Sequence, residues 1–113
     1  MRVTTFEALA DDTRRRIVEL LALTELPAGE IAESFDVSGP AVSRHLRVLR
    51  EAEVVRYRRD GQRWVYSLDP RPLIELDGWI RHNVDTWRRR FAALGDHLDD
   101  MEAQEESSKG TKR

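Results

Sequence analysis

The chain has 113 residues, 40% of them hydrophobic and 35% charged, which suits a single small globular domain. It contains no cysteine, so disulfides, cysteine-ligated metals and a thiol nucleophile are excluded. The first residues show no signal-peptide pattern, and no apolar stretch approaches the ~20 residues that span a membrane. We therefore expect a cytoplasmic protein without a membrane partner.

The formal net charge of −2 is unevenly distributed along the chain. Residues 38–66 hold seven arginines against three acidic residues, whereas residues 95–108 hold six acidic residues and no lysine or arginine. A basic centre beside an acidic end is typical of a protein that meets a polyanion with one face. Ordinary solvated helices produce the same pattern, so charge alone leaves both interpretations open.

The first third of the chain predicts short helices separated by tight turns. A short helix near residues 6–9 precedes one over Thr13–Leu23, which one of two preceding aspartates caps by accepting from first-turn N–H groups. Pro27 fits the first turn of the next helix, which is expected to end near Ser34. Residues 35–38 then form a tight connection.

A further helix is predicted from Gly39 to about Ala52, with Ser38 as its N-cap. At 100° per residue, Val42, Leu46 and Leu49 share one side, which must pack on the preceding helices. His45 lies on a flank. The opposite side points outward and consists of Pro40, Ser43, Arg44, Arg47 and Glu51.

The periodicity then changes to two over Val54–Arg59 and Arg63–Leu68. Between these strands lies Asp60-Gly61-Gln62, and Asp-Gly is a strong hairpin signal because both residues accept positive φ. We therefore predict a mainly α fold with a small β-hairpin, whose arms carry several arginines.

A helical pattern resumes at Leu73 and continues to about Met101. From residue 80 its apolar residues follow a near-heptad seam, which we expect to be the interface of a homodimer. The seam consists of Ile80, Val84, Trp87, Phe91, Leu94 and Leu98. We expect the aromatic residues of this helix to pack in the core or in the dimer interface. The alternative is that they line an effector pocket, and they are Trp79, Trp87 and Phe91. The polar residues 105–113 are expected to be a disordered tail.

Short helices, a tight turn, an outward helix and a basic hairpin together make the winged helix-turn-helix pattern. Ala8–Ile17 resembles the start of the ArsR (arsenical-resistance repressor) family, Val37–Ala52 resembles its recognition helix, and Arg59–Leu68 resembles its wing. The resemblance covers roughly residues 6–100. It implies a dimeric bacterial or archaeal regulator, most often a repressor.

Under this resemblance, residues 1–70 are the winged DNA-binding region and residues 71–104 are a long C-terminal dimerisation helix of the same domain. Two departures matter. Position 27 is proline where the family often has serine, so the usual capping box with Glu30 is lost. Residues 29–34 hold none of the cysteines that metal-sensing members use.

Histidines and aspartates on the last helix do not fall at the spacing of the metal-sensing members. They are His82, Asp85, Asp96, His97 and Asp100. Two histidines 15 residues apart are typical of a surface, although zinc shared across a dimer is the alternative. We therefore predict no metal and no cofactor, with the effector unknown.

The outward helix supplies the candidate reading head. Arg44 and Ser43 are expected at base edges, because arginine presents a two-donor fork to guanine. Ser38 and Arg47, with Gly39 and Pro40 at the helix start, are expected near phosphate. His45 is open between packing, phosphate contact and base contact.

The wing supplies the second candidate surface. Arg58, Arg59, Gln62 and Arg63 are expected to reach the minor groove or phosphates. The alternative is that these arginines do not contact DNA and instead keep an edge strand soluble.

No constellation of catalytic residues appears, so we predict that the chain is not an enzyme. The favoured function is a sequence-specific transcriptional regulator, a repressor that binds an inverted-repeat operator in double-stranded DNA as a homodimer. The alternative is a winged-helix protein-interaction module without DNA binding, although such a module would not need so much outward arginine.

Overall fold

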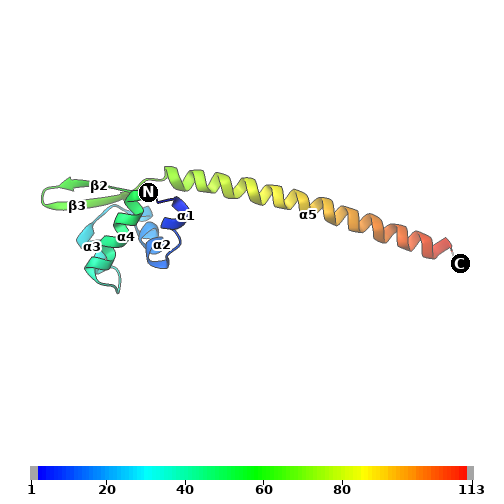
Figure 1. Cartoon of the computed structure of the whole chain (residues 1–113), viewed down its shortest axis with the longest axis horizontal. Coiled ribbons are helices and arrows are strands. Elements are labelled where there is room, and N and C mark those ends of the chain that lie inside the picture. The colour runs from blue at the N-terminus through cyan, green and yellow to red at the C-terminus, as the bar shows by residue number, and fades with distance from the viewer. Residues whose placement is uncertain (1–2, 112–113) are drawn as a thin grey trace. The chain divides into compact units, whose positions relative to one another are not determined.

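The computed structural model describes the backbone of residues 3–111 and the side chains of residues 3–105 (Figure 1). The described chain forms two compact units, and the division falls between Leu76 and Asp77. The helices are α1 (Thr5–Ala8), α2 (Asp12–Leu23), α3 (Ala28–Glu33), α4 (Gly39–Glu51) and α5 (Arg71–Thr111). The strands are β1 (Leu26–Pro27), β2 (Val55–Asp60) and β3 (Arg63–Leu68).

The helices of the first unit begin at polar caps. The Asp11 carboxylate accepts from the Arg14 N–H at 3.0 Å, and the Ser38 hydroxyl accepts from the Ala41 N–H at 3.2 Å. Both caps were predicted, and each satisfies a first-turn donor that would otherwise lack a partner. Pro27 was expected inside α3 but instead precedes it in an extended conformation.

The strands form one antiparallel sheet in the order β1-β3-β2. Residues 61 and 62 connect β2 to β3, and Gly61 has the positive φ of 64° that a two-residue hairpin loop requires. The sequence interpretation missed β1, which pairs Leu26 with Tyr66 and Pro27 with Val65. Proline is tolerated there because an edge strand does not need every N–H.

The core of the first unit lies under the sheet and between α2, α3 and α4. Its fully buried side chains include Ile17 of α2, Ile31 of α3 and Leu49 of α4. The predicted inner face of α4 is confirmed, since Val42 and Leu46 are also buried. This packing fixes which side of α4 faces outward.

Helix α5 is longer than predicted, because it begins at Arg71 and continues to Thr111. The tail expected from residue 105 is therefore helical as far as Thr111, and residues 112–113 lie outside the described residues. No proline follows Pro72, and residues 102–106 are alanine, glutamate and glutamine, which favour helix. From Asp77 to Glu105 no described side chain is buried.

This architecture confirms the predicted fold class. It is a mainly helical winged helix-turn-helix with a small sheet and a long C-terminal helix. No helix in the described part of the chain has both the length and the apolar character needed to cross a membrane.

Candidate nucleic-acid interface

The outward face of α4 is exposed and positively charged. Ser43, Arg44 and Arg47 are exposed, and among the described residues neither arginine pairs with a carboxylate. The start of the helix, Ser38 to Pro40, is exposed as well. This face can donate hydrogen bonds to base edges from guanidinium and hydroxyl groups. Its N-terminal N–H groups can meet phosphate.

A tight reversal joins α4 to the wing. Glu53 adopts a φ of 62°, and the Val54 N–H then donates to the Leu49 carbonyl at 3.0 Å. The hairpin therefore begins within a few residues of the end of α4 (Figure 1). The sequence held no sign of this reversal, because glutamate is not a residue that favours positive φ.

His45 is partly buried against the start of α2. Its Nδ1 lies 3.3 Å from Nη1 of Arg14 and 3.8 Å from the Asp11 carboxylate. Arg14 also donates to the carbonyls of Glu7 and Ala8, and its N–H lowers the pKa of Asp11. Of the three roles left open for His45, packing is the one that these contacts favour.

The four predicted wing residues have different surroundings. Arg58 makes two hydrogen bonds to the Glu25 carboxylate, at 2.7 and 2.8 Å, and this pairing lowers the pKa of Glu25. Arg63 lies 3.6 Å from the Asp60 carboxylate. Arg59 donates to the Gly61 carbonyl at 3.1 Å, which places it at the tip of the wing beside Gln62. Arg58 is therefore the least free of the three arginines to bind phosphate.

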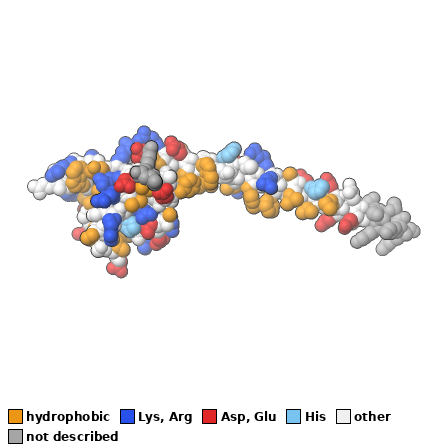
Figure 2. Space-filling view, viewed as in Figure 1, with side chains coloured by type: hydrophobic (Ala, Val, Ile, Leu, Met, Phe, Trp, Pro, Cys, Tyr) orange, Lys and Arg blue, Asp and Glu red, His pale blue; other side chains and the backbone are white. Residues whose placement is uncertain are grey.

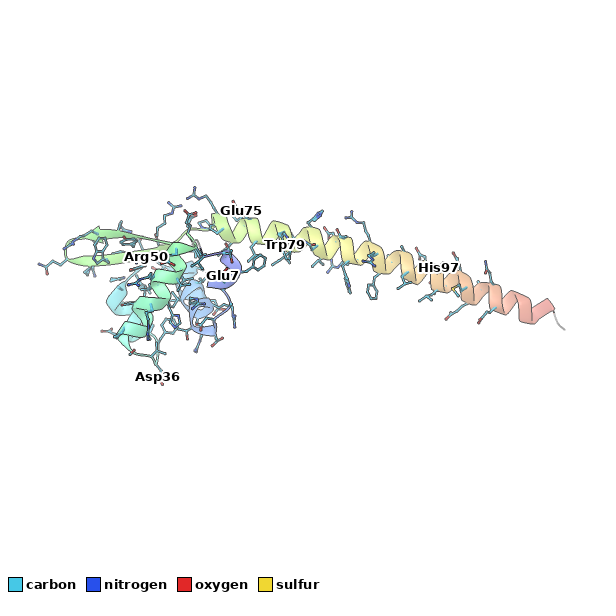
Figure 3. The ribbon with its side chains drawn as sticks, viewed as in Figure 1. Glu7, Asp36, Arg50, Glu75, Trp79 and His97 are labelled. Carbon is cyan, nitrogen blue, oxygen red and sulfur yellow. The ribbon has the colours of Figure 1, made fainter. Side chains whose placement is uncertain are left out.

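A row of arginine and aromatic side chains links α4 to the wing. Arg50, labelled in Figure 3, comes from α4, and its guanidinium lies 4.5 Å above the ring centre of Tyr57. The ring centre of Tyr57 is 5.0 Å from that of Trp64 and 5.7 Å from that of Tyr66. Arg59 lies 5.4 Å from the ring centre of Trp64. Cation–π and aromatic contacts of this kind hold the strands in a defined position relative to α4.

Asp69 anchors the base of the wing. Its side chain is buried and accepts from Arg56 of β2 at 3.0 Å and from Arg71 at 2.8 Å, while its N–H donates to the Val54 carbonyl at 2.9 Å. The hydrogen bonds from Arg71, and then those from Arg56, hold the pKa of the Asp69 carboxyl well below its usual range although burial opposes this. The sequence pattern assigned this position no role beyond following the strand predicted over Arg63–Leu68.

The predicted seam on α5 forms an apolar stripe along one side of the helix (Figure 2). All six of its residues are exposed, and the rings of Trp87 and Phe91 lie 4.6 Å apart. Figure 2 also shows blue side chains midway along this helix and red ones beyond them. The described residues contain no group of three potential metal ligands, so His82 and His97 are not part of such a cluster within one chain.

Comparison with known proteins identifies bacterial transcriptional regulators as relatives of this chain. Residues 11–57 match the family of bacterial regulatory proteins named arsR. The chain is 45% identical over 95 residues to the HTH-type transcriptional regulator Rv2034 of Mycobacterium tuberculosis, covering 83% of this chain and 85% of that protein. It is 43% identical over 80 residues to the transcriptional repressor SdpR of Bacillus subtilis, and the match covers 71% of this chain and 89% of that protein.

A solved structure agrees with these relatives. The ArsR-like transcriptional regulator from Rhodococcus sp. RHA1 superposes with a TM-score of 0.70 at 28% sequence identity. The match covers 79% of this chain and 84% of that chain.

Proposed function

The chain belongs to the ArsR family of bacterial transcriptional regulators, and from this premise we propose that it is a repressor that binds an inverted-repeat operator as a homodimer. The observation that carries the proposal is the outward face of α4, where Arg44 and Arg47 are exposed without carboxylate partners in the described chain. Members of the family are regulators rather than enzymes.

Helix α4 is the recognition helix of the proposed complex, the helix that enters the major groove. Arg44 donates two hydrogen bonds to O6 and N7 of a guanine in the major groove, and Ser43 contacts the neighbouring base edge. Ser38, Gly39 and Pro40 bring the start of the helix to a phosphate, and Arg47 neutralises the next.

The wing supplies contacts that depend less on sequence. Arg59 and Gln62 lie at its tip, and Arg63 follows them on β3. We assign these side chains to the minor groove or to phosphates. Arg58 has a smaller role, because Glu25 already holds its guanidinium.

Two recognition helices are needed, because one short helix makes too few base contacts to select a site in a genome. Two-fold pairing places two recognition helices roughly 34 Å apart, one helical turn of DNA. The exposed seam on α5 supports this pairing, since a second α5 is the simplest cover for Trp87 and Phe91.

Fluorescence anisotropy at two salt concentrations tests the reading head. Arg44→Ala should weaken operator binding by about 1–3 kcal/mol, because it removes a base-edge donor pair. Arg59→Ala should weaken operator and random DNA alike and reduce the salt dependence. Arg16→Ala on α2 is the matched control and should change neither.

Operator binding by Arg44→Ala as tight as that of the wild type would show that the face of α4 has been wrongly assigned. The alternative, a protein-interaction module, requires that the wild type show no salt-dependent binding to the DNA upstream of its own gene.

A further inference from the structure

A hollow of about 420 Å³ lies in the first unit between α3 and the tip of the wing. Pro27, Ala28 and Glu30 line it from the start of α3, and Gln62, Arg63 and Trp64 line it from the wing. Small-molecule sites commonly enclose roughly 300–1,000 Å³ and combine apolar walls with a few polar groups. This hollow has the size and the mixed lining of such a site.

Its charged wall is acidic. Glu30 and Glu33 both line the hollow and lie three residues apart on α3, which places their carboxylates on one side of the helix. Both are exposed, and no cation in the described part of the chain pairs with either. Arg63 also lines the hollow, but its guanidinium lies 3.6 Å from the Asp60 carboxylate, so the lining sets two unpaired carboxylates against one guanidinium that already has a partner. The hollow therefore favours a positively charged occupant.

Its apolar wall suits the same occupant. Pro27 and Ala28 are uncharged, and Trp64 adds an indole that is 43% exposed. That indole already attracts one cation within the chain, since the Arg59 guanidinium lies 5.4 Å from its ring centre. An aromatic surface of this kind can also pack against the apolar body of a ligand.

We propose that this hollow is a binding site for an organic cation with an apolar body, of the class of arylalkyl amines, and that such a ligand competes with DNA. The ammonium group lies between Glu30 and Glu33, and the apolar body lies against Pro27 and Trp64. Competition follows because Gln62 and Arg63 line the hollow and are also assigned to DNA. Only this competition rests on the proposed function.

Calorimetry of the full chain tests the site with 3-phenylpropylamine and its neutral analogue 3-phenylpropan-1-ol. The amine should bind roughly tenfold more tightly than the alcohol, because only the amine offers a charge to the carboxylates. The double variant Glu30→Gln/Glu33→Gln should lose about that tenfold preference, whereas Glu19→Gln on α2 should keep it. Equal binding of amine and alcohol, or no binding of either, overturns the proposal.

The tryptophan indole N–H resonances locate the site. The Trp64 signal, assigned with Trp64→Phe, should shift with added amine, while those of Trp79 and Trp87 should not. Shifts confined to Trp79 or Trp87 would place the amine on α5 and overturn the site.

Anisotropy on operator DNA tests the competition. Saturating amine should weaken DNA binding by about threefold or more in the wild type, and not in Glu30→Gln/Glu33→Gln at the same amine concentration. Amine binding that leaves DNA affinity unchanged overturns the competition. A wild type that binds no DNA refutes the proposed function instead, and the calorimetry still decides the amine site.

Discussion

The winged unit and the long helix contain similar apolar residues, but only the winged unit buries them. Ile17, Ile31 and Leu49 are fully buried in the first unit, whereas Trp79, Trp87 and Phe91 of α5 are each 56% exposed. Helices in proteins gain most of their stability from packing an apolar face. The difference teaches that the winged unit buries its apolar residues within one chain, while α5 beyond Asp77 leaves its apolar stripe exposed for the proposed homodimer to cover.

Polar contacts also differ between the two regions, because some of those in the winged unit join distant segments, whereas those described in α5 beyond residue 76 are local and exposed. The winged unit holds a buried Asp69 between two arginines and joins Arg58 to Glu25 over a separation of 33 residues. In α5, Arg81 meets Asp77 one turn away at 3.0 Å, and both are exposed. Exposed pairs of that kind contribute little to stability.

The largest expected effect is on the core of the winged unit. Leu46→Ala should lower the free energy of unfolding by about 2–5 kcal/mol, because it leaves a cavity among side chains that cannot fully relax. Urea denaturation followed by circular dichroism measures it. The matched control is Leu98→Ala, whose cost in free energy of unfolding should fall as the protein is diluted if, as proposed, a partner chain covers Leu98. A cost for Leu98→Ala that does not vary with dilution would contradict the comparison.

The next effect concerns the seam on α5. Phe91→Glu should give a folded monomer whose operator affinity is reduced roughly 100-fold, because one reading head loses most of the specific contacts. Sedimentation equilibrium with circular dichroism reports mass and fold, and anisotropy reports binding. Ala103→Glu, on the side of α5 away from the seam, should remain dimeric.

Two results would refute the dimer interpretation. One is a wild type that is monomeric at about ten micromolar protein or more, far above the concentrations at which specific regulators act. The other is a monomeric Phe91→Glu protein that binds operator normally.

A smaller effect depends on pH. The pKa of Asp69 is lowered in the folded state, so its contribution to stability is present above the unfolded pKa of about 4 and is lost as pH falls below it. The stability difference between wild type and Asp69→Asn should therefore be constant near neutral pH and shrink toward about pH 3. Unfolding at both pH values measures it, with Asp85→Asn as the exposed control. A difference that grows in acid would show that the ion pairs of Asp69 do not stabilise the fold.

The smallest expected effect is on the charge of the wing. Glu25→Gln should release Arg58 and strengthen binding to random DNA by about twofold at low salt, with no change at high salt. Asp77→Asn releases Arg81 on α5 in the same way and should leave DNA binding unchanged. Equal effects from the two variants would mean that the wing contributes no more to DNA binding than α5 does.

The amino-acid sequence by itself determined the elements whose patterns repeat along the chain. The spacing of Val42, Leu46 and Leu49 predicted the inner face of α4, and Asp60-Gly61 predicted the hairpin loop, because each depends only on backbone geometry between near neighbours. The proline-free stretch after Pro72 also carried the information for α5, although its polar end was interpreted as disordered.

Only the tertiary structure decided which distant residues meet. Strand β1 is two residues long, too short for any period, and exists because Val65 and Tyr66 lie beside it. The pairing of Arg58 with Glu25, the burial of Asp69, the row from Arg50 to Trp64 and the hollow beside α3 likewise join separate segments. Their energies arise from packing and charge at short distances in space, which local sequence patterns do not record.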